Sequence, residues 1–291
     1  HIGVPLTLLA MPAKAEVAVI EMGINRPGEM SELCRIAEPT HGLLTNIGKE
    51  HLAGFGNIEG VKKAEGELYE YLDDNKGLIF VNTSEKHLNR MSNQIKRKVI
   101  YHKSDFLSHN SKVIDIQLRQ HVPHVSVDFL SEVNMRVNVQ SQLSGMHNFH
   151  NVMTAIALGL YFKIPTEDIK SAIENYQPLP NRSQWIERGS NRILLDAYNS
   201  NPSSALSAIK NLVDMPHFGK KIAILGDMLE LGEKSQSEHA FLLRRIRQLS
   251  SKLSLALIGP EFARCKDIKK TTRYFSNVEE AKDWFANQNF T

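Results

Sequence analysis

Short apolar runs alternate with segments of helical periodicity along the first hundred residues. The runs at 17–20, 42–47, 78–81 and 99–102 are short and bounded, as buried strands are. The segment 61–72 between two of them places apolar residues on one face of a helix. This alternation predicts a parallel sheet with crossover helices.

The pattern changes to period two between residues 113 and 140. Alternating apolar positions there predict an antiparallel ribbon attached to the edge of the parallel sheet. Helical periodicity returns at 145–160 and again behind Pro165, where Thr166 is a candidate N-cap.

A second α/β set follows the proline-bearing stretch 178–182. At 291 residues the chain exceeds what one hydrophobic core usually supports, so two domains are expected. We place them at 1–180 and 181–291. The fold class is therefore α/β, with a central parallel-sheet domain followed by a smaller α/β domain whose predicted strands are 193–196, 222–225, 253–258 and 273–275.

Two helices in the second domain have recognisable beginnings. Asn201 followed by Pro202 is a strong helix start, because Asn caps the free N–H groups and Pro suits the first helical position. Ser235 and Glu238 have the spacing of a capping box.

Composition excludes several classes of protein. The formal charge of +3 is small and scattered, which argues against nucleic-acid binding. No apolar run is long enough for a membrane span. Two widely spaced cysteines without a metal-ligand pattern suit a reducing cytoplasm.

Candidate chemistry lies at the ends of two predicted strands. Glu21 follows the run 17–20, and a loop carrying His51 follows the run 42–47. Ligands in open α/β sheets bind beyond the carboxyl ends of the strands, so these residues suit Mg²⁺-assisted phosphate chemistry. A solvated loop and a strand-end carboxylate facing water are the alternatives that the residues alone leave open.

Asn148 and Asn151 form a second candidate site. Three residues apart in the first turn of the helix 145–160, they share one face. A carboxamide offers a donor and an acceptor together, as the edge of a purine does. Helix capping is the simpler explanation for one of them but does not account for both.

Five segments together resemble the Mur ligase family. They occur in the family's order, cover nearly the whole chain, and the last two favour the branch that adds D-alanyl-D-alanine. The segments are EMGINRPGEM (21–30), TNIGKEHLAGFG (45–56), GMHNFHN (145–151), LDAYNSNPSSAL (195–206) and GDMLELGEKSQSEH (226–239).

The resemblance implies an ADP-forming, ATP-dependent amide ligase of cell-wall peptidoglycan synthesis. It would phosphorylate the carboxylate of UDP-N-acetylmuramoyl tripeptide, and the amine of D-alanyl-D-alanine would then displace phosphate. A Rossmann-like fold for the domain 181–291 is implied as well, as is a monomer in the cytoplasm. The residues that match the family's positions are Glu21 and His51 around Mg²⁺, Asn148 and Asn151 near adenine, Arg182 on the nucleotide, Asp196 at the ribose, and Tyr198, Asn199 and Asn201 facing the incoming dipeptide.

The chain departs from the family pattern at three places. It contains no G-x-x-x-x-G-K-[ST] phosphate loop, so we expect an amino-terminal part, the UDP-sugar domain included, to be missing and this piece to be inactive. Where relatives carry a carbamylated lysine, the alignment puts Glu65, whose carboxylate could hold the second Mg²⁺; Lys62 or Lys63 would require a shifted helix register. The stretch at Arg182 reads PNR instead of the usual PGR.

Two other functions stay open at this point. One is a sister ligase, either the diamino-acid-adding Mur enzyme or a folylpolyglutamate-type enzyme, against which segments 195–206 and 226–239 argue. The other is a non-catalytic nucleotide- or partner-binding module that has lost the phosphate loop by descent.

Overall fold

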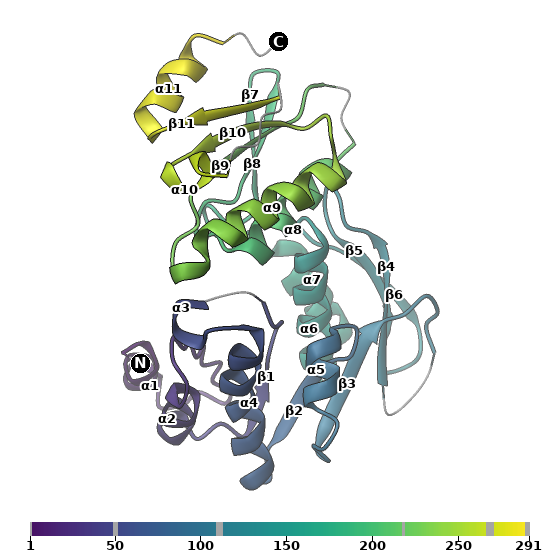
Figure 1. The fold of residues 1–291 in the computed structure, drawn as a ribbon. Coiled ribbons are helices and arrows are strands. Elements are labelled where there is room, and N and C mark those ends of the chain that lie inside the picture. The colour runs from purple at the N-terminus through teal and green to yellow at the C-terminus, as the bar shows by residue number, and fades with distance from the viewer. Residues whose placement is uncertain (1, 49–51, 109–112, 217–218, 266–270, 289–291) are drawn as a thin grey trace. The chain divides into compact units, whose positions relative to one another are not determined.

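The fold is described from a computed structural model of the chain, which covers residues 2–48, 52–108, 113–216, 219–265 and 271–288 (Figure 1). The chain forms two compact units. Unit 1 comprises 1–117, 129–137 and 153–166, and unit 2 comprises 118–128, 138–152 and 167–291.

A six-stranded sheet has the strand order β1-β2-β3-β4-β5-β6. The pairs from β1 to β4 are parallel, with Gly42 opposite Ile79 and Ile100 opposite Val113. The connections from β4 to β5 and from β5 to β6 are too short for a parallel crossover, so these strands form the predicted ribbon of hairpins. The strands are β1 (His41–Leu43), β2 (Leu78–Asn82), β3 (Lys98–Lys103), β4 (Val113–Gln120), β5 (Ser126–Leu130) and β6 (Arg136–Gln140).

Seven helices accompany this sheet in the described part of the chain. The face predicted for α4 is confirmed: Val61, Ala64, Leu68 and Leu72 are all buried. The helices are α1 (Gly3–Ala10), α2 (Glu29–Ala37), α3 (Leu52–Phe55), α4 (Ile58–Asp74), α5 (Lys86–Met91), α6 (Met146–Tyr161) and α7 (Thr166–Asn175).

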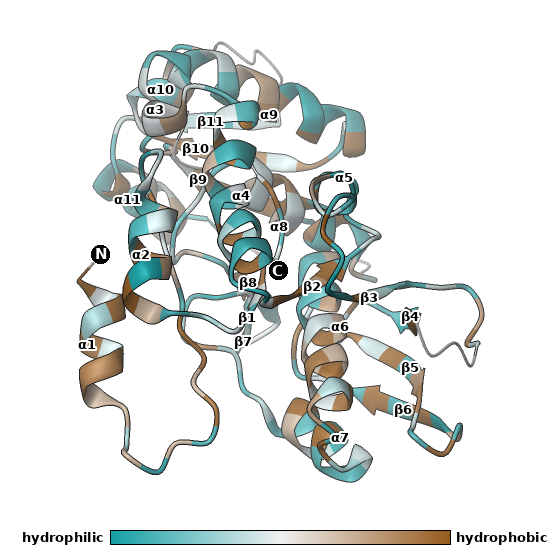
Figure 2. Ribbon diagram, turned by 90° about the horizontal axis from the view of Figure 1, so that it is seen from below, coloured by the Kyte–Doolittle hydropathy of each residue, from teal (hydrophilic) through white to brown (hydrophobic). Residues whose placement is uncertain are grey.

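The strand predicted at 17–20 is wrong. The segment is extended but belongs to no strand, and Val17 and Val19 are 62% and 90% exposed. An apolar run indicates that a segment can be buried, but a strand also needs neighbouring backbone groups to pair with. Within the described residues β1 pairs with β2, and no strand pairing joins β1 to this segment. Figure 2 shows the same region, including α1, coloured largely as hydrophobic.

Unit 2 contains a three-stranded parallel sheet of order β11-β10-β9 and an antiparallel pair β7–β8. The strands are β7 (Gln184–Arg188), β8 (Asn191–Leu195), β9 (Ile222–Gly226), β10 (Ser254–Ile258) and β11 (Thr272–Phe275). The helices are α8 (Pro202–Asp214), the 3-10 turn η1 (Gly232–Lys234), α9 (Ser235–Leu249), α10 (Pro260–Ala263) and α11 (Val278–Ala286).

Of the two helix starts predicted at Asn201 and Ser235, the first is confirmed. Asn201 caps α8 in a full capping box with Ser204, as its sequence predicts. The capping box predicted for α9 is wrong, because η1 already supplies a helical turn before Ser235 and no side chain caps the helix. Ser235 Oγ instead donates to Glu261 Oε2 at 2.7 Å.

Candidate functional site

The loop 181–183 in unit 2 is fastened by hydrogen bonds to residues 196–198, at the end of β8. The carbonyl of Asn181 accepts hydrogen bonds from the backbone N–H groups of Ala197 and Tyr198, at 2.9 and 3.0 Å. The backbone N–H of Ser183 donates to Asp196 Oδ1 at 3.3 Å. Asn181 and Ser183 have positive φ values of 64° and 49°, so the chain takes up left-handed geometry to make these bonds.

Arg182 lies between these two left-handed residues. Its guanidinium carbon sits 4.0 Å from the centre of the Tyr198 ring, which is the geometry of a cation–π contact. Both side chains are exposed, Tyr198 to 66%. The structure therefore brings together a cation and an aromatic ring that lie sixteen positions apart in the sequence.

His147 joins this loop to the first turn of α6. Its Nε2 lies 3.2 Å from Ser183 Oγ. Burial lowers the pKa of His147, and the charge of Asp196 opposes that shift. The neutral ring is therefore favoured, while its Nδ1 is buried and has no hydrogen-bond partner among the described residues.

The two asparagines of α6 are hydrogen-bonded to each other. Asn151 Nδ2 donates to Asn148 Oδ1 at 3.2 Å, and Asn148 Nδ2 donates to the carbonyl of Ser144 at 2.9 Å. Asn148 is buried at 8% exposure, whereas Asn151 is exposed. Asn148 thus fixes the carboxamide of Asn151 at the surface.

The same network reaches α8. Ser144 Oγ donates to Asn211 Oδ1 at 3.1 Å, and Asn211 is 1% exposed. Between Ser144 and the helix lies Gly145, whose φ is +95° and whose missing Cβ would sit 3.1 Å from Asn211 Nδ2. Glycine is required here both by the backbone angle and by the close approach of α8.

Asn199 and Asn201 bond to nearby backbone groups. Asn199 Oδ1 accepts from the N–H of Ser200 at 2.8 Å. Asn201 Oδ1 accepts from the N–H groups of Ser203 and Ser204 at 2.9 and 2.8 Å. The oxygen of Asn201 is therefore already engaged in capping α8.

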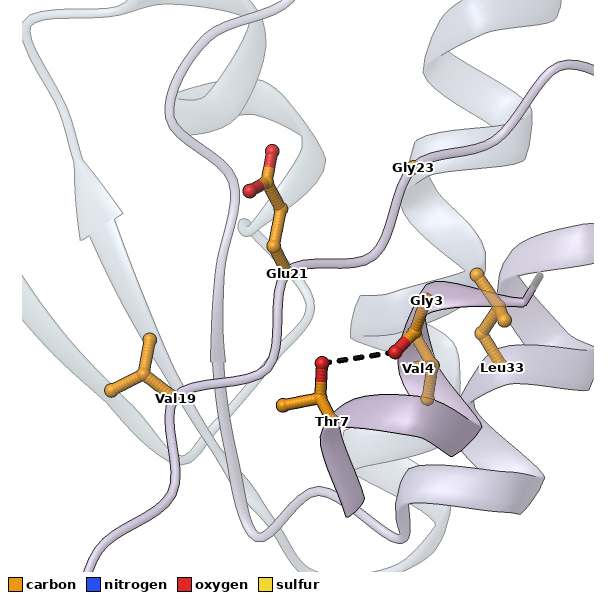
Figure 3. A pocket seen from close by; sticks show the side chains of 7 residues that line it. All are labelled: Gly3, Val4, Thr7, Val19, Glu21, Gly23 and Leu33. Atoms are coloured by element: carbon orange, nitrogen blue, oxygen red, sulfur yellow. Dashed lines mark hydrogen bonds between the residues drawn. The ribbon is translucent and has the colours of Figure 1, made fainter. Parts of the chain in front are cut away.

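Glu21 lies in unit 1 beside a cavity of about 430 Å³ (Figure 3). The cavity is formed between the start of α1 and the extended segment that carries Val19 and Glu21. Its wall at α1 is fixed by the hydrogen bond from Thr7 Oγ1 to the carbonyl of Gly3. The exposed carboxylate of Glu21 offers the hard oxygen atoms that Mg²⁺ prefers.

Glu65 and His51 are the remaining candidates for metal binding. Glu65 is half-buried on α4, and His51 lies outside the described residues. Lys62 is paired with Glu59 on the same helix, with 2.6 Å between Nζ and Oε1. Across the described ranges, no group of three or more His, Cys, Asp or Glu side chains is arranged to hold a metal ion.

Two carboxylates that the sequence analysis missed organise the loop after Glu21. Glu29 Oε2 accepts from the N–H of Asn25 at 2.7 Å, and its Oε1 lies 2.9 Å from Arg26 Nε. These hydrogen bonds lower the pKa of Glu29. Glu67, on α4, accepts from the N–H of Gly28 at 2.8 Å.

The other residues that the sequence analysis missed are His147, Ser183, Ser144 and Asn211. His147 stands next to Asn148 in the segment GMHNFHN, which was its one visible signal. The other three are ordinary polar residues whose role arises from contacts between distant parts of the chain. In the described part of the chain, no helix is both long and apolar enough to cross a membrane.

Comparison with known families matches almost the entire chain. Residues 1–159 match the Mur ligase middle domain, and residues 181–288 match the Mur ligase glutamate ligase domain. The similarity therefore includes both Glu21 and the loop around Arg182.

Individual relatives agree with this result. The UDP-N-acetylmuramoyl-tripeptide–D-alanyl-D-alanine ligase of Bacillus subtilis is 33% identical over 82% of the chain and 50% of its own length. The enzyme of the same name from Escherichia coli is 33% identical over 82% of the chain and 52% of its own length. The chain spans about half the length of these relatives.

Solved structures share the fold. A crystal structure of MurF from Acinetobacter baumannii superposes with a TM-score of 0.85 at 25% identity, over 98% of this chain and 61% of that one. MurF of Thermotoga maritima in complex with ADP gives 0.80 at 23% identity, over 99% of this chain and 65% of that one. With both of its parts matched in sequence and in fold, the chain belongs to the Mur ligase family.

Proposed function

We propose that the whole protein is an ATP-dependent ligase that joins D-alanyl-D-alanine to UDP-N-acetylmuramoyl tripeptide in peptidoglycan precursor synthesis. The observation that carries the proposal is the fastened loop of unit 2, with Arg182 stacked on Tyr198 beside Asp196. The relatives named for this reaction support the choice of substrates. This chain supplies the central domain and the carboxyl-terminal domain, divided near residue 180.

Unit 2 holds the groups proposed for the nucleoside. The exposed carboxamide of Asn151, held by Asn148, suits the donor and acceptor pattern of adenine. Asp196, beside the fastened loop, suits a ribose hydroxyl, and Arg182 suits phosphate oxygens. The MurF structure that contains ADP is consistent with a nucleotide site in this fold.

Unit 1 holds the groups proposed for the metal side of the reaction. Glu21 and Glu65 offer oxygen ligands, and His51 is assigned from the family pattern. Mg²⁺ would neutralise the charges of triphosphate and carboxylate as they approach each other. Within this chain, Glu29 and Glu67 hold the loop after Glu21 by accepting hydrogen bonds from the N–H groups of Asn25 and Gly28.

The incoming dipeptide is assigned to the loop before α8. Tyr198 and Asn199 are exposed there, directly after Asp196. Asn201 contributes by fixing the start of α8, since its Oδ1 is bonded to backbone N–H groups. Its Nδ2 is the part of the side chain that could reach a substrate.

The experiment that tests the function is phosphate release by the whole protein with ATP, Mg²⁺ and UDP-N-acetylmuramoyl tripeptide. D-alanyl-D-alanine, single amino acids and glutamate are compared as the incoming amine. Release with the dipeptide alone is the expected result. Phosphate release with a single amino acid would assign the protein to a sister ligase. No phosphate release with any amine would favour the non-catalytic binding module instead.

The role of Glu65 is tested separately in the whole protein. Glu65→Gln keeps the size of the side chain but removes the charge that would bind Mg²⁺, so we expect turnover to fall by about 10²-fold or more. Glu70→Gln, on an exposed position of the same helix, is the matched control. Normal turnover of Glu65→Gln would remove this residue from the site.

A further inference from the structure

The loop 227–231 follows β9 at its carboxyl end. Ligands of parallel α/β sheets bind at this end of the strands. The loop carries Leu229 with its side chain 75% exposed, and Glu230 takes a left-handed φ of 61°. An exposed leucine alone is ordinary, so the significance of Leu229 depends on how the loop is held.

One buried histidine is hydrogen-bonded to the backbone of the loop. His239, on α9, is completely buried. Its Nε2 is 2.9 Å from the backbone N of Met228, which can only donate, so Nε2 is the unprotonated nitrogen. Its Nδ1 therefore carries the proton and donates to the carbonyl of Ser235 at 2.7 Å. The neutral ring thus links the loop to the first turn of α9.

A second attachment lies one residue before Met228. The carboxylate of Asp227 accepts hydrogen bonds from the backbone N–H groups of Glu261 and Phe262, at 2.9 and 3.0 Å. The ring of Phe262 packs edge-on against His239, with 4.6 Å between ring centres. The chain before Leu229 is therefore held at Asp227 and Met228, and Leu231, after the bend, is buried.

This arrangement is specific to histidine. The side chain must accept from an N–H on one side and donate to a carbonyl on the other while packing as a flat ring against Phe262. A buried polar ring is unfavourable unless it is hydrogen-bonded, and His239 meets that condition through the loop itself. The loop that carries the exposed Leu229 is thus held by buried groups on the adjacent residues Asp227 and Met228.

We propose that loop 227–231 is part of the site for the incoming amine, with Leu229 as an apolar contact and His239 as the residue that positions the loop. The inference rests on the proposed function, since D-alanyl-D-alanine presents two methyl groups and little else that is apolar. An exposed apolar side chain on a held loop at the carboxyl end of a strand would distinguish such a substrate from glutamate, whose side chain is charged.

The first test uses Leu229→Ser in the whole protein, with Leu249→Ser as the matched control at another exposed leucine. We expect the KM for D-alanyl-D-alanine to rise about five- to tenfold in Leu229→Ser, because the apolar contact is lost. The KM for ATP and kcat should stay close to those of the unchanged protein. Equal dipeptide KM values for the two variants would overturn the assignment of the loop.

The second test separates positioning from folding. His239→Gln keeps an acceptor for the Met228 N–H, whereas His239→Phe keeps the ring shape but removes both hydrogen bonds. We expect the Met228 amide to exchange its hydrogen faster in the Phe variant than in the Gln variant, and the dipeptide KM to rise in the same order. Unchanged exchange, or a KM that rises for ATP as much as for the dipeptide, would contradict a positioning role.

The two proposals fail in different ways. If the unchanged protein releases no phosphate with D-alanyl-D-alanine, the proposed function fails and the dipeptide contact of Leu229 fails with it. If the unchanged protein is active but Leu229→Ser behaves as Leu249→Ser does, only the assignment of the loop is wrong.

Discussion

Replacing Asn201 by alanine should destabilise the protein by a predictable amount. Its Oδ1 accepts two backbone N–H groups at the start of α8, from Ser203 and Ser204. Removing an N-cap of this kind costs about 0.5–2 kcal/mol. The bond from the backbone N–H of Asn201 to Ser204 Oγ does not need the Asn201 side chain, so we expect a loss near the middle of that range, about 1 kcal/mol.

The assay is urea unfolding of the 291-residue chain, followed by the circular dichroism of its helices. In a thermal scan a loss of about 1 kcal/mol corresponds to a shift in Tm of roughly 2–4 °C for a protein of this size class. Asn201→Asp is the control, because its carboxylate can accept the same N–H groups and carries a charge that suits the amino-terminal end of a helix. An alanine variant with an unchanged urea midpoint, or an aspartate variant as unstable as alanine, would refute the reasoning.

The same pair of variants examines the substrate role assigned to Asn201. The aspartate variant preserves the cap but has no amide Nδ2. If Asn201 contacts the dipeptide, the aspartate variant of the whole protein should show a raised dipeptide KM with normal stability. If it only caps α8, the KM should stay normal.

Three further predictions follow from contacts inside the two units. Gly145→Ala should lower the free energy of unfolding by about 1–3 kcal/mol, because φ is +95° and the new Cβ would approach Asn211; an unchanged thermal midpoint would contradict this. Burial lowers the pKa of His147, so the unfolded chain binds more protons below about pH 6.5, and stability should fall on acidification less steeply in His147→Gln than in the unchanged chain. Glu67→Ala should cost about 1 kcal/mol in urea unfolding, because the N–H of Gly28 loses its acceptor, and Glu67→Gln should lose less.

Much of the fold is predictable because burial leaves a periodic mark on the sequence. The spacing of Val61, Ala64 and Leu68 shows which face of α4 is buried without any knowledge of its neighbours. The run at 17–20 has an equally clear apolar pattern, but its pairing depends on other segments, so the predicted strand is wrong. Strand β7 escaped notice because Gln184–Arg188 mixes apolar and charged residues and only its pairing with β8 makes it a strand.

The candidate site shows the same division. The spacing of Asn148 and Asn151 indicates a shared face, and the structure places them in hydrogen-bond contact. The contact between His147 and Ser183 joins residues thirty-six positions apart, so local periodicity cannot indicate it. The helix cap at Ser235 was predicted from spacing alone and is wrong, because Ser235 Oγ bonds to Glu261 instead.

The bond between Ser144 and Asn211 has a consequence for how this chain can change in evolution. Ser144 lies in the segment that matches the Mur ligase middle domain, and Asn211 lies in the segment that matches the glutamate ligase domain. Both oxygen atoms of the bond are buried. Losing either partner leaves a buried polar group without a hydrogen bond, whereas exchanging both for apolar residues of similar shape is nearly neutral. Substitutions at these two positions should therefore occur together among close homologues, and Ser144→Ala should be tolerated better in a protein that also carries Asn211→Leu.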